Sequence, residues 1–424
     1  MEDELRNASG YLARGNLAAA DICCRQVLGR ASGHPAALNI AGIVAALLGL
    51  PNAAIVYFEQ ACAAENGLRH ARDNLLRARR LAAAQVHGEP HGERFLLIKA
   101  WGYDFWSDVN HVLGALLLAE ITARIPVVHW GRNSRFTDGS DRDAFEFYFQ
   151  PVSEYSIEDL YLLEKPVFFP AKWAKEKLWL EDHAKWRGFG SRLAALYYLN
   201  RRETVAVSDF YIGVVDLMPW IPRQHPLHGK SIAEAYRFLT AKYLRPRESI
   251  LAAVNDFFEQ HIAGFHTIAV HLRGSDKQIE MGDTAAINRR YLEVLDGTLK
   301  PASRVFLLTD DARWVTVFRN AYGNRVIVTD CQRTHDDTGI HYSKSADRVA
   351  LGREIMHDTY LAARADRFIG NGQSNVSAMI ALLTDWPPDN CVLLAPPVLY
   401  ERNLRVFVEG VDGPPQICTT DWQF

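Results

Sequence analysis

The stretch TIAVHLRGSDKQIEMGD, residues 267–283, decides the fold of this chain. Its first four residues form a short apolar run, which is typical of a strand that is buried on both faces in a parallel sheet. Polar and charged side chains follow at once, where the strand ends. In open α/β sheets, ligands bind in the crevice outside the carboxyl ends of the strands. We therefore expect these side chains to face a ligand.

The residue types after this strand suit an anionic ligand. Arg273 offers a planar fork of donors that matches phosphate oxygens, and Lys277 adds a point charge beside it. Asp276 can orient the two cations, and Glu280 is a further carboxylate in the same loop. The plainer alternative is a charged surface loop after a strand, and the residue types alone do not decide between the two.

The rest of the second half of the chain alternates between strand and helix patterns. The expected strands are 267–272, 304–309, 325–329 and 367–370, and the expected helices are 231–244, 248–261, 288–298, 311–321, 347–364 and 374–383. Alternation of this kind predicts a parallel, doubly wound sheet.

The first half of the chain contains a similar opening. FLLIK, residues 95–99, is followed by a loop, a helix pattern and a second apolar run, and 205–213 is predicted as a further strand. Asp108, Asn110 and His111 lie where the helix begins, and helix N-termini favour anions or hydroxyls. We expect these three residues on the acceptor side of a site. The alternative is that Asp108 only caps the helix.

Several motifs resemble those of one enzyme family. HLRGSDK, residues 271–277, resembles the HxRRxDK signature of the inverting fucosyltransferases, which include the α1,6-fucosyltransferases and the protein O-fucosyltransferases. YLRP at 243–246 precedes a helix as in the α1,6 enzymes, and FLLTDDARW at 306–314 resembles their strand-TDD-helix motif. In this chain Gly274 replaces the second Arg of the signature.

A third motif of that family is similar to HDTYLAARADRFIGNGQSNVSAMI, residues 357–380. Asp358 and Asn375 keep the family's spacing, Ser374 matches its Ser, and Asn375 replaces its Gln. The motifs occur in the family's order.

The resemblance implies a GT-B architecture of two Rossmann-like domains that face each other across a cleft, a GDP-sugar as donor, and sugar transfer without a metal or other cofactor. The expected donor-binding residues are His271, Arg273, Asp276, Lys277, Asp310, Asp311, Asp358, Ser374 and Asn375. Arg273 is predicted to hold the diphosphate, and the family match gives Asp358 the guanine edge.

The acceptor hydroxyl needs a general base on the face opposite the leaving group. The family has a Glu at the position that Met281 occupies here, so Glu280 is the candidate base and Asp283 its substitute. Arg273 is the third residue expected to act in catalysis. Two other interpretations stay open: a transferase that uses a different GDP-sugar, or a non-catalytic scaffold with a GDP-binding domain.

The first 85 residues are rich in Ala and Leu and contain an internal repeat. Five positions with small residues, or with a larger residue that packs beside them, are matched 34 positions later. The pairs are Ala8 and Gly42, Gly15 and Gly49, Ala20 and Ala54, Cys24 and Phe58, and Val27 and Ala61. This is the tetratricopeptide period, although a plain helical bundle is the alternative. Fewer than three units are present, so we expect the module to dock on the rest of the chain. Such repeats bind peptides or form dimers, so a protein or peptide acceptor and a homodimer are possible partners beside a glycan acceptor.

Composition bounds the remaining possibilities. A length of 424 residues suggests two or three domains, and the sequence patterns place three at 1–85, 94–245 and 246–424. A net charge of −3 favours neither nucleic acid nor an anionic membrane. The longest apolar run, 113–121, is too short to span a bilayer, and no signal peptide begins the sequence. Six cysteines without metal-ligand spacing are typical of reduced thiols, which suits the cytoplasm.

Two further patterns have a structural and a functional interpretation. Asp141-Arg142-Asp143 matches the DxD pattern of metal-dependent glycosyltransferases, but its polar surroundings favour a solvated loop, and no metal is expected. Scattered aromatic residues could form a carbohydrate platform, or they could belong to the core: Tyr148, Trp173, Trp179, Trp186, Tyr197 and Tyr198.

Overall fold

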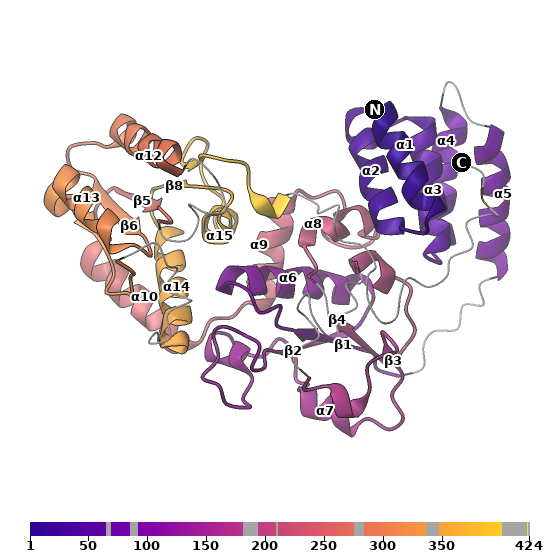
Figure 1. Cartoon of the computed structure of the whole chain (residues 1–424), viewed down its shortest axis with the longest axis horizontal. Coiled ribbons are helices and arrows are strands. Elements are labelled where there is room, and N and C mark those ends of the chain that lie inside the picture. The colour runs from indigo at the N-terminus through magenta and orange to yellow at the C-terminus, as the bar shows by residue number, and fades with distance from the viewer. Residues whose placement is uncertain are drawn as a thin grey trace.

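The computed structural model describes residues 1–64, 69–84, 92–180, 194–208, 211–274, 284–335, 347–400 and 422. Figure 1 shows three parts: an N-terminal helical module, a first lobe built around strands β1 to β4, and a second lobe built around strands β5 to β9. The three domain boundaries expected from the sequence stay a prediction, although each expected domain contains one of these parts.

The helical module contains two helical hairpins and a fifth helix. Its helices are α1 (Glu2–Ala13), α2 (Leu17–Arg30), α3 (Pro35–Leu47), α4 (Pro51–Ala63) and α5 (Arg69–Ala84). Gly15 and Gly49, which are 34 residues apart, turn the chain within the two hairpins with φ angles of 73° and 77°, a region that favours glycine. A Cβ on Gly42 would lie 2.5 Å from the ring of Phe58, so the small residue lets α3 and α4 approach. The repeat is therefore a repeat of helical hairpins, and its tetratricopeptide identity stays a prediction.

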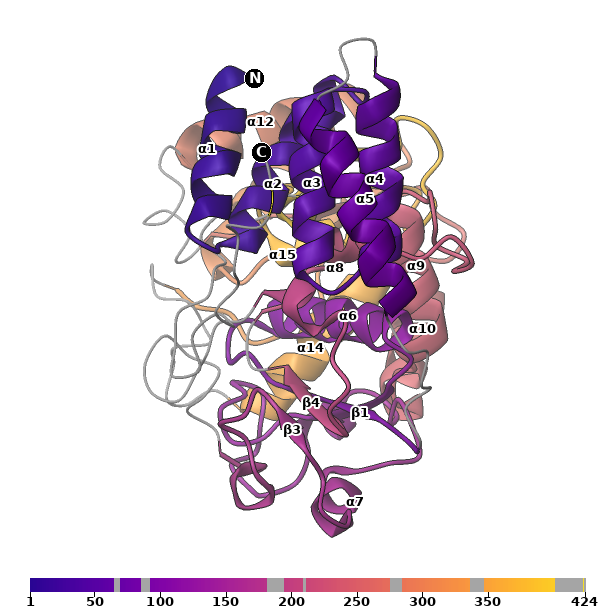
Figure 2. The same cartoon turned by 90° about the vertical axis from the view of Figure 1, so that its right-hand side faces the viewer.

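The module docks on the first lobe, as its small number of units predicted. Buried side chains of α1 to α4 form one hydrophobic core with α6 (Phe105–Ile121) and α8 (Val214–Leu217). Arg25 of α2 lies over the ring of Trp220, 5.0 Å from its centroid, and Trp422 stacks on Phe58. Figure 2 shows the module beside α6 and α8.

The first lobe is a four-stranded parallel sheet with layers on both faces. Its strands are β1 (Phe95–Lys99), β2 (Ile125–His129), β3 (Phe168–Phe169) and β4 (Val205–Ser208), in the order β2-β1-β4-β3. Leu96 and Ile98 of β1 pack on α6, whereas Phe95 and Leu97 face α7 (Ile157–Leu162) on the other side. Short helices and α9 complete the lobe: η1 (Ala144–Phe147), η2 (Lys175–Lys177), η3 (Ala195–Tyr198), η4 (Met218–Trp220) and α9 (Ile232–Tyr243).

The second lobe is a five-stranded parallel sheet. Its strands are β5 (Thr267–His271), β6 (Arg304–Leu308), β7 (Val326–Ile327), β8 (Arg367–Gly370) and β9 (Cys391–Leu393), in the order β7-β6-β5-β8-β9. Its helices are α10 (Glu248–His261), α12 (Thr284–Thr298), α13 (Ala312–Tyr322), α14 (Arg348–Ala362) and α15 (Asn375–Leu383), with the short helices η5 (Gly323–Arg325) and η7 (Val398–Tyr400). The strand order reverses between β5 and β8, and this switch point is where doubly wound sheets bind ligands.

Strand β5 is buried on both faces, as its apolar run predicted. Ile268 and Val270 pack in the core that contains residues of α12 and α13, and Ala269 packs in the core that contains residues of α10, α14 and α15. The second sheet is therefore doubly wound, and the predicted α/β fold with two parallel sheets and an N-terminal helical module is confirmed.

Some predicted elements differ in length. The strand predicted at 205–213 ends at Ser208. The strand predicted at 325–329 is shortened to the two residues of β7. β3 and β9 were not predicted, because two or three residues at a sheet edge leave no periodic pattern in the sequence.

The scattered aromatic residues belong mainly to the core. Four of them are buried: Tyr148, Trp173, Tyr197 and Tyr198. Trp179 is 38% exposed and packs edge-on against Tyr161, and Trp186 lies outside the described residues. The carbohydrate-platform interpretation therefore has no support from the described side chains.

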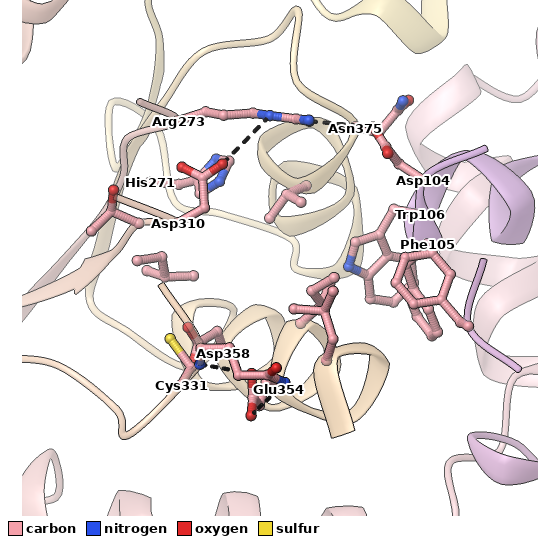
Figure 3. A pocket seen from close by; sticks show the side chains of 17 residues that line it. Asp104, Phe105, Trp106, His271, Arg273, Asp310, Cys331, Glu354, Asp358 and Asn375 are labelled. Carbon is pink, nitrogen blue, oxygen red and sulfur yellow. Dashed lines mark hydrogen bonds and ion pairs between the residues drawn. The ribbon is translucent and has the colours of Figure 1, made fainter. Parts of the chain in front are cut away.

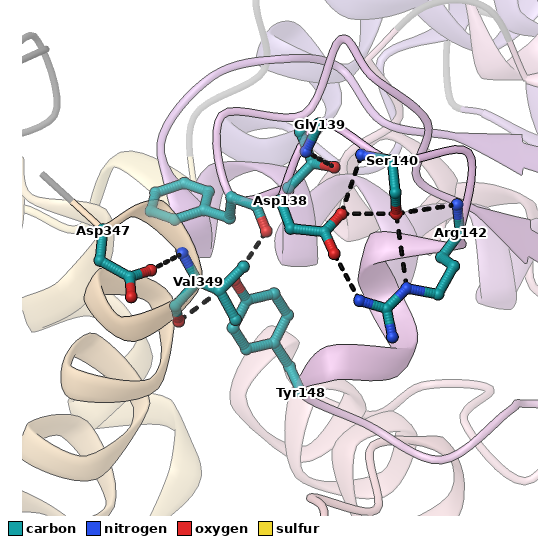
Figure 4. A network of polar contacts seen from close by, with 9 residues as sticks. Asp138, Gly139, Ser140, Arg142, Tyr148, Asp347 and Val349 are labelled. Atoms are coloured by element: carbon teal, nitrogen blue, oxygen red, sulfur yellow. Dashed lines mark hydrogen bonds and ion pairs between the residues drawn. The ribbon is translucent and has the colours of Figure 1, made fainter.

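The two lobes meet at η1 and at the connection between α9 and α10. The backbone of Gln150 donates to the carbonyl of Arg245 over 2.8 Å, and that of Arg247 donates to the carbonyl of Tyr148 over 2.9 Å. Figure 4 shows the Tyr148 ring against the first turn of α14, where Gly352 leaves room for it. The hydroxyl of Tyr148 lies 3.5 Å from the carbonyl of Val349 in α14. These contacts fix the lobes relative to each other.

None of the helices in the described part of the chain combines the length and the apolar character needed to cross a membrane.

A glycine in α6 tests this packing. A Cβ on Gly114 would lie 2.1 Å from the carbonyl oxygen of Ile212, which is backbone and cannot rotate away. We expect Gly114→Ala to lower the free energy of unfolding by ~1–3 kcal/mol because of overpacking. Gly29→Ala in α2, where nothing lies within 4 Å, is the matched control and should raise stability by up to ~1 kcal/mol. Urea denaturation measures both, and equal effects of the two substitutions would contradict the close approach of α6 to Ile212.

Candidate functional site

A cavity lies between the two lobes at the carboxyl ends of β5 and β6. Figure 3 shows Arg273 on one side of this cavity and Asp358 on the other. Its walls come from the start of α6, the ends of β5 and β6, the segment after β7, one face of α14 and the start of α15. These are the chain segments that the switch point of the second sheet brings together.

Arg273 extends across the cavity from the end of β5. Its guanidinium Nη1 lies 3.4 Å from Oδ2 of Asp104, and its Nε lies 4.0 Å from Oδ2 of Asp310. The other oxygen of Asp310 accepts the backbone N–H of Gly274 over 3.0 Å. Asp310 therefore holds the chain just after β5 while it balances the charge of Arg273. Among the described residues that line the cavity, Arg273 is the only Lys or Arg.

The glycine that departs from the family signature has a packing role. A Cβ on Gly274 would lie 2.8 Å from Cβ of Asp311 and 2.8 Å from Cδ1 of Trp314. A second Arg at this position would collide with α13. The glycine thus lets the chain after β5 lie close to α13, and the chain has no second cation at this position.

His271 links β5 to α15 across the switch point. Its Nδ1 lies 2.7 Å from Oγ of Ser377, and that hydroxyl also accepts the backbone N–H of Asn371 over 3.1 Å. Burial, together with the charge of Arg273, lowers the pKa of His271 to about 3. His271 is therefore neutral near pH 7 and acts as a hydrogen-bonding group rather than a cation.

One face of α14 forms the opposite wall. Leu351, Glu354, Ile355 and Asp358 line the cavity at helical spacing. Oδ1 of Asp358 accepts the hydroxyl of Thr329 over 2.7 Å, which ties α14 to the segment after β7. Glu354 was not predicted, although its position one helical turn before Asp358 is a signal that the sequence contains.

The segment after β7 closes this wall. Glu354 accepts the backbone N–H of Gln332 over 2.9 Å. Burial, with the neighbouring charge of Asp358, raises the pKa of the Cys331 thiol to about 12, so this thiol stays protonated. Cys331 and Gln332 both line the cavity, and no sequence motif singles them out.

The start of α15 supplies the last wall. Asn375 lines the cavity, and its Oδ1 accepts the side-chain amide of Asn110 from α6 over 3.5 Å. Ser374, at the N-cap position of α15, is only 4% exposed, and its hydroxyl has no hydrogen-bond partner among the described residues. A ligand at this helix N-terminus could satisfy it.

The residues predicted for the acceptor side, Asp108, Asn110 and His111, do not line the cavity, because they lie about one helical turn after the residues of α6 that do. Asp108 accepts the backbone N–H of Gly102 and that of Tyr103 over 3.0 and 3.3 Å, and burial raises its pKa to about 7. His111 accepts the backbone N–H of Ile212 over 2.9 Å, and burial lowers its pKa to about 3. Both are fully buried and support the loop and the segment beside β4.

The first residues of α6 reach the cavity instead. Asp104, Phe105 and Trp106 line it, and the indole N–H of Trp106 donates to the hydroxyl of Thr359 over 2.8 Å. Because α6 begins at Phe105, these residues form its tip, whereas the residues one turn later pack toward the sheet.

Asp311 does not face the cavity. It caps α13 and forms a two-pronged pair with Arg313, with a shortest N–O distance of 2.8 Å. Four predicted residues lie outside the described part of the chain: Asp276, Lys277, Glu280 and Asp283.

The DxD segment has two different aspartates. Asp141 is exposed and lies 2.7 Å from Arg132. Asp143 is half-buried: it accepts the backbone N–H of Trp130 over 2.8 Å and that of Phe145 over 3.0 Å, and desolvation raises its pKa to about 7. The exposed Asp141 fits the expected solvated loop, whereas Asp143 has a structural role as the cap of η1. Across the described ranges, no three His, Cys, Asp or Glu side chains are grouped to hold a metal ion.

No family model and no curated protein matches this chain. Similar solved structures include NodZ α-1,6-fucosyltransferase co-crystallised with GDP, with 20% identity, 69% of this chain and 93% of that chain covered, and a TM-score of 0.46. POFUT1 in its apo form has 15% identity, 72% and 99% coverage, and a TM-score of 0.42. An Arabidopsis thaliana FUT1 variant in complex with GDP has 12% identity, 85% and 81% coverage, and a TM-score of 0.41. The structures similar to this chain thus include an α-1,6-fucosyltransferase, the group that the motifs of this chain resemble.

Proposed function

We propose that this chain is an inverting glycosyltransferase that transfers a sugar, with GDP-fucose as the expected donor, to a hydroxyl of a glycan or protein. The observation that carries the proposal is the arrangement of Arg273, Asp358 and Asn375 around one cavity at the switch point of the second sheet. A cation, a buried carboxylate and a helix N-terminus are the groups that a guanosine diphosphate requires.

The diphosphate is assigned to the Arg273 side of the cavity. When the bond between sugar and diphosphate breaks, negative charge grows on the departing oxygen. Arg273 is only 16% exposed, so its attraction for that charge is less screened than at a solvated surface. The helix N-terminus at Ser374 and Asn375 adds backbone donors, and the unpartnered hydroxyl of Ser374 adds another.

The guanine is assigned to the α14 side. A carboxylate can accept the paired N–H donors of a guanine edge, and a uracil or an adenine does not offer the same pair. Asp358 is buried and its position is fixed by Thr329, so it is preorganised for this role. His357 approaches the same oxygen as Thr329, at 3.7 Å, which leaves the approach to the second oxygen to the ligand.

The transfer step follows from these positions. The acceptor oxygen attacks the anomeric carbon from the side opposite the diphosphate, and the bond to GDP breaks with its electron pair on GDP. The acceptor proton must go to a base, for which Glu280, or Asp283 in its place, is our proposal because both follow the β5 motif in the sequence. The proposal includes no metal or other cofactor.

The acceptor and the oligomeric state rest on the sequence alone. The repeats of the helical module are typical of peptide-binding or dimer-forming surfaces, so a protein or peptide acceptor and a homodimer are proposals beside a glycan acceptor. The sequence points to the cytoplasm as the location.

A donor panel tests the function directly. We expect GDP and GDP-fucose to raise the melting temperature of the full chain, because a ligand that binds only the folded state stabilises it. UDP-sugars and ADP-sugars should have no effect. A stronger shift with another GDP-sugar would retain the fold assignment and change the sugar, whereas no shift with any GDP compound would refute the proposal.

Removal of the cation should affect both binding and transfer. We expect Arg273→Ala to lower kcat/KM by about 100- to 1000-fold, because the developing charge on the diphosphate loses its partner. Arg313→Ala is the matched control, since Arg313 pairs with Asp311 on α13 and does not line the cavity. Kinetics of sugar transfer and calorimetry with GDP measure the two effects. Wild-type turnover in the Arg273 variant would remove the assignment.

Selectivity for the base should depend on Asp358. We expect Asp358→Asn to weaken GDP binding by about 10- to 100-fold, the effect of losing hydrogen bonds to a charged group, and to change UDP binding little. Asp347→Asn at the N-cap of the same helix is the control, because asparagine caps a helix about as well as aspartate. Calorimetric titration with both nucleotides checks this, and an equal loss for GDP and UDP would argue against a contact with the base.

A further inference from the structure

Polar contacts join the start of α6 to the second lobe. Asp104 lies against Arg273, Trp106 donates to Thr359, and Asn110 donates to Asn375. Trp106 and Asn110 are buried, whereas the Asp104 side chain is 34% exposed and lines the cavity. A ligand that enters the cavity can therefore reach the Asp104 contact without disturbing the core.

The carboxylate of Asp104 lies between two arginines from different lobes. Oδ2 is 3.4 Å from Nη1 of Arg273, and Oδ1 is 3.8 Å from Nη1 of Arg135 in the segment between β2 and η1. The Asp104 side chain makes no capping hydrogen bond to α6, although the residue occupies the N-cap position. The carboxylate can leave Arg273 and remain paired with Arg135, so its movement strands no partly buried charge.

The Asp104 contact and the proposed diphosphate compete for one cation. A guanidinium presents a planar fork that suits carboxylate and phosphate oxygens alike. A diphosphate bound to Arg273 would also place its negative charge beside Asp104, and two like charges at such a distance repel each other. The diphosphate carries more charge than the carboxylate, so it is the stronger competitor.

We propose that Asp104 is a positioning residue that holds Arg273 in the empty cavity, is displaced by the diphosphate of the donor, and then pairs with Arg135. The inference rests on the proposed function for the identity of the ligand, while the exchange itself requires only a diphosphate. It links the arrival of the donor to a rearrangement at the tip of α6. It also gives GDP a competitor for Arg273 that is always present, which favours release of the product.

The experiment is a double-mutant cycle on the full chain, read by calorimetry with inorganic pyrophosphate and with GDP. We expect Asp104→Asn to bind both about fivefold more tightly, because the competitor loses its charge. We expect Arg135→Gln to bind both about threefold more weakly, because Asp104 loses its second partner and stays on Arg273. In the Asp104→Asn background, Arg135→Gln should change the dissociation constants by less than about 1.5-fold.

Asp141→Asn and Arg132→Gln are the matched controls. These two residues lie in the same segment as Arg135 and pair with each other at 2.7 Å, and neither lines the cavity. Each control removes the same charge as its test variant, and we expect no change in binding. Thermal unfolding of all variants shows whether the fold is kept.

Each other outcome decides the question. Equal weakening by Arg135→Gln in both backgrounds means that Arg135 acts only through its long-range charge, and this overturns the exchange. Unchanged or weaker binding by Asp104→Asn also overturns it, as does the absence of pyrophosphate binding in every variant. The expected cycle without transfer from any GDP-sugar would refute the proposed function and leave the exchange in place.

Discussion

Strand β5 hydrogen-bonds to β6 on one side and to β8 on the other, and this double pairing positions the second-lobe part of the site. Helices cover both faces of β5, so Ile268, Ala269 and Val270 are apolar. The pairing also places the end of β5 between the Asp310 that follows β6 and the helix that follows β8. The sheet thus places the chain segments of the site, and contacts between side chains such as His271 and Ser377 then orient the polar groups.

The hydrogen bond between His271 and Ser377 shows what this constraint does to the chemistry. The imidazole is buried against the switch point and stays neutral, because burial lowers its pKa to about 3. The side chains of Asp311 and Trp314 leave no space for a second Arg at position 274. Arg273 therefore acts in a preorganised surrounding of neutral hydrogen-bonding groups and opposed carboxylates, which is the condition under which one cation can stabilise a developing charge strongly.

The sequence predicted the second lobe well because its strands are buried on both faces and its helices are long. The strand ends led to Arg273 and Asp310, since residues at the carboxyl ends of parallel strands converge, and the resemblance to the fucosyltransferase motifs led to Asp358 and Asn375. The positions that could not be predicted depend on where an element begins in three dimensions. Polar residues from Asp104 to His111 all lie near the start of α6, and only packing decides that the tip faces the cavity while the next turn supports the sheet.

Asp143 shows the complementary limit. Its polar neighbours in the sequence indicate a solvated loop, but its carboxylate accepts two backbone N–H groups and caps η1. For Glu354 the sequence shows the spacing of one helical turn from Asp358. Its role in holding the backbone of Gln332 is evident only from the structure. Local pattern identifies which residues can carry chemistry, and tertiary hydrogen bonds decide which of them are used for structure.

The balance of charge in the cavity decides which group must move when a ligand binds. Within the described part of the wall, Arg273 faces four carboxylates: Asp104, Asp310, Glu354 and Asp358. Glu354 and Asp358 lie on α14, where a base that brings its own N–H donors can match them. The two near Arg273 already balance its charge, so an added diphosphate leaves an excess of negative charge there. Asp310 is tied to the backbone of Gly274, and Asp104 has Arg135 as a second partner. The carboxylate that can leave at the lower cost is therefore Asp104, which places the mobile part of the site on the first lobe and the fixed part on the second.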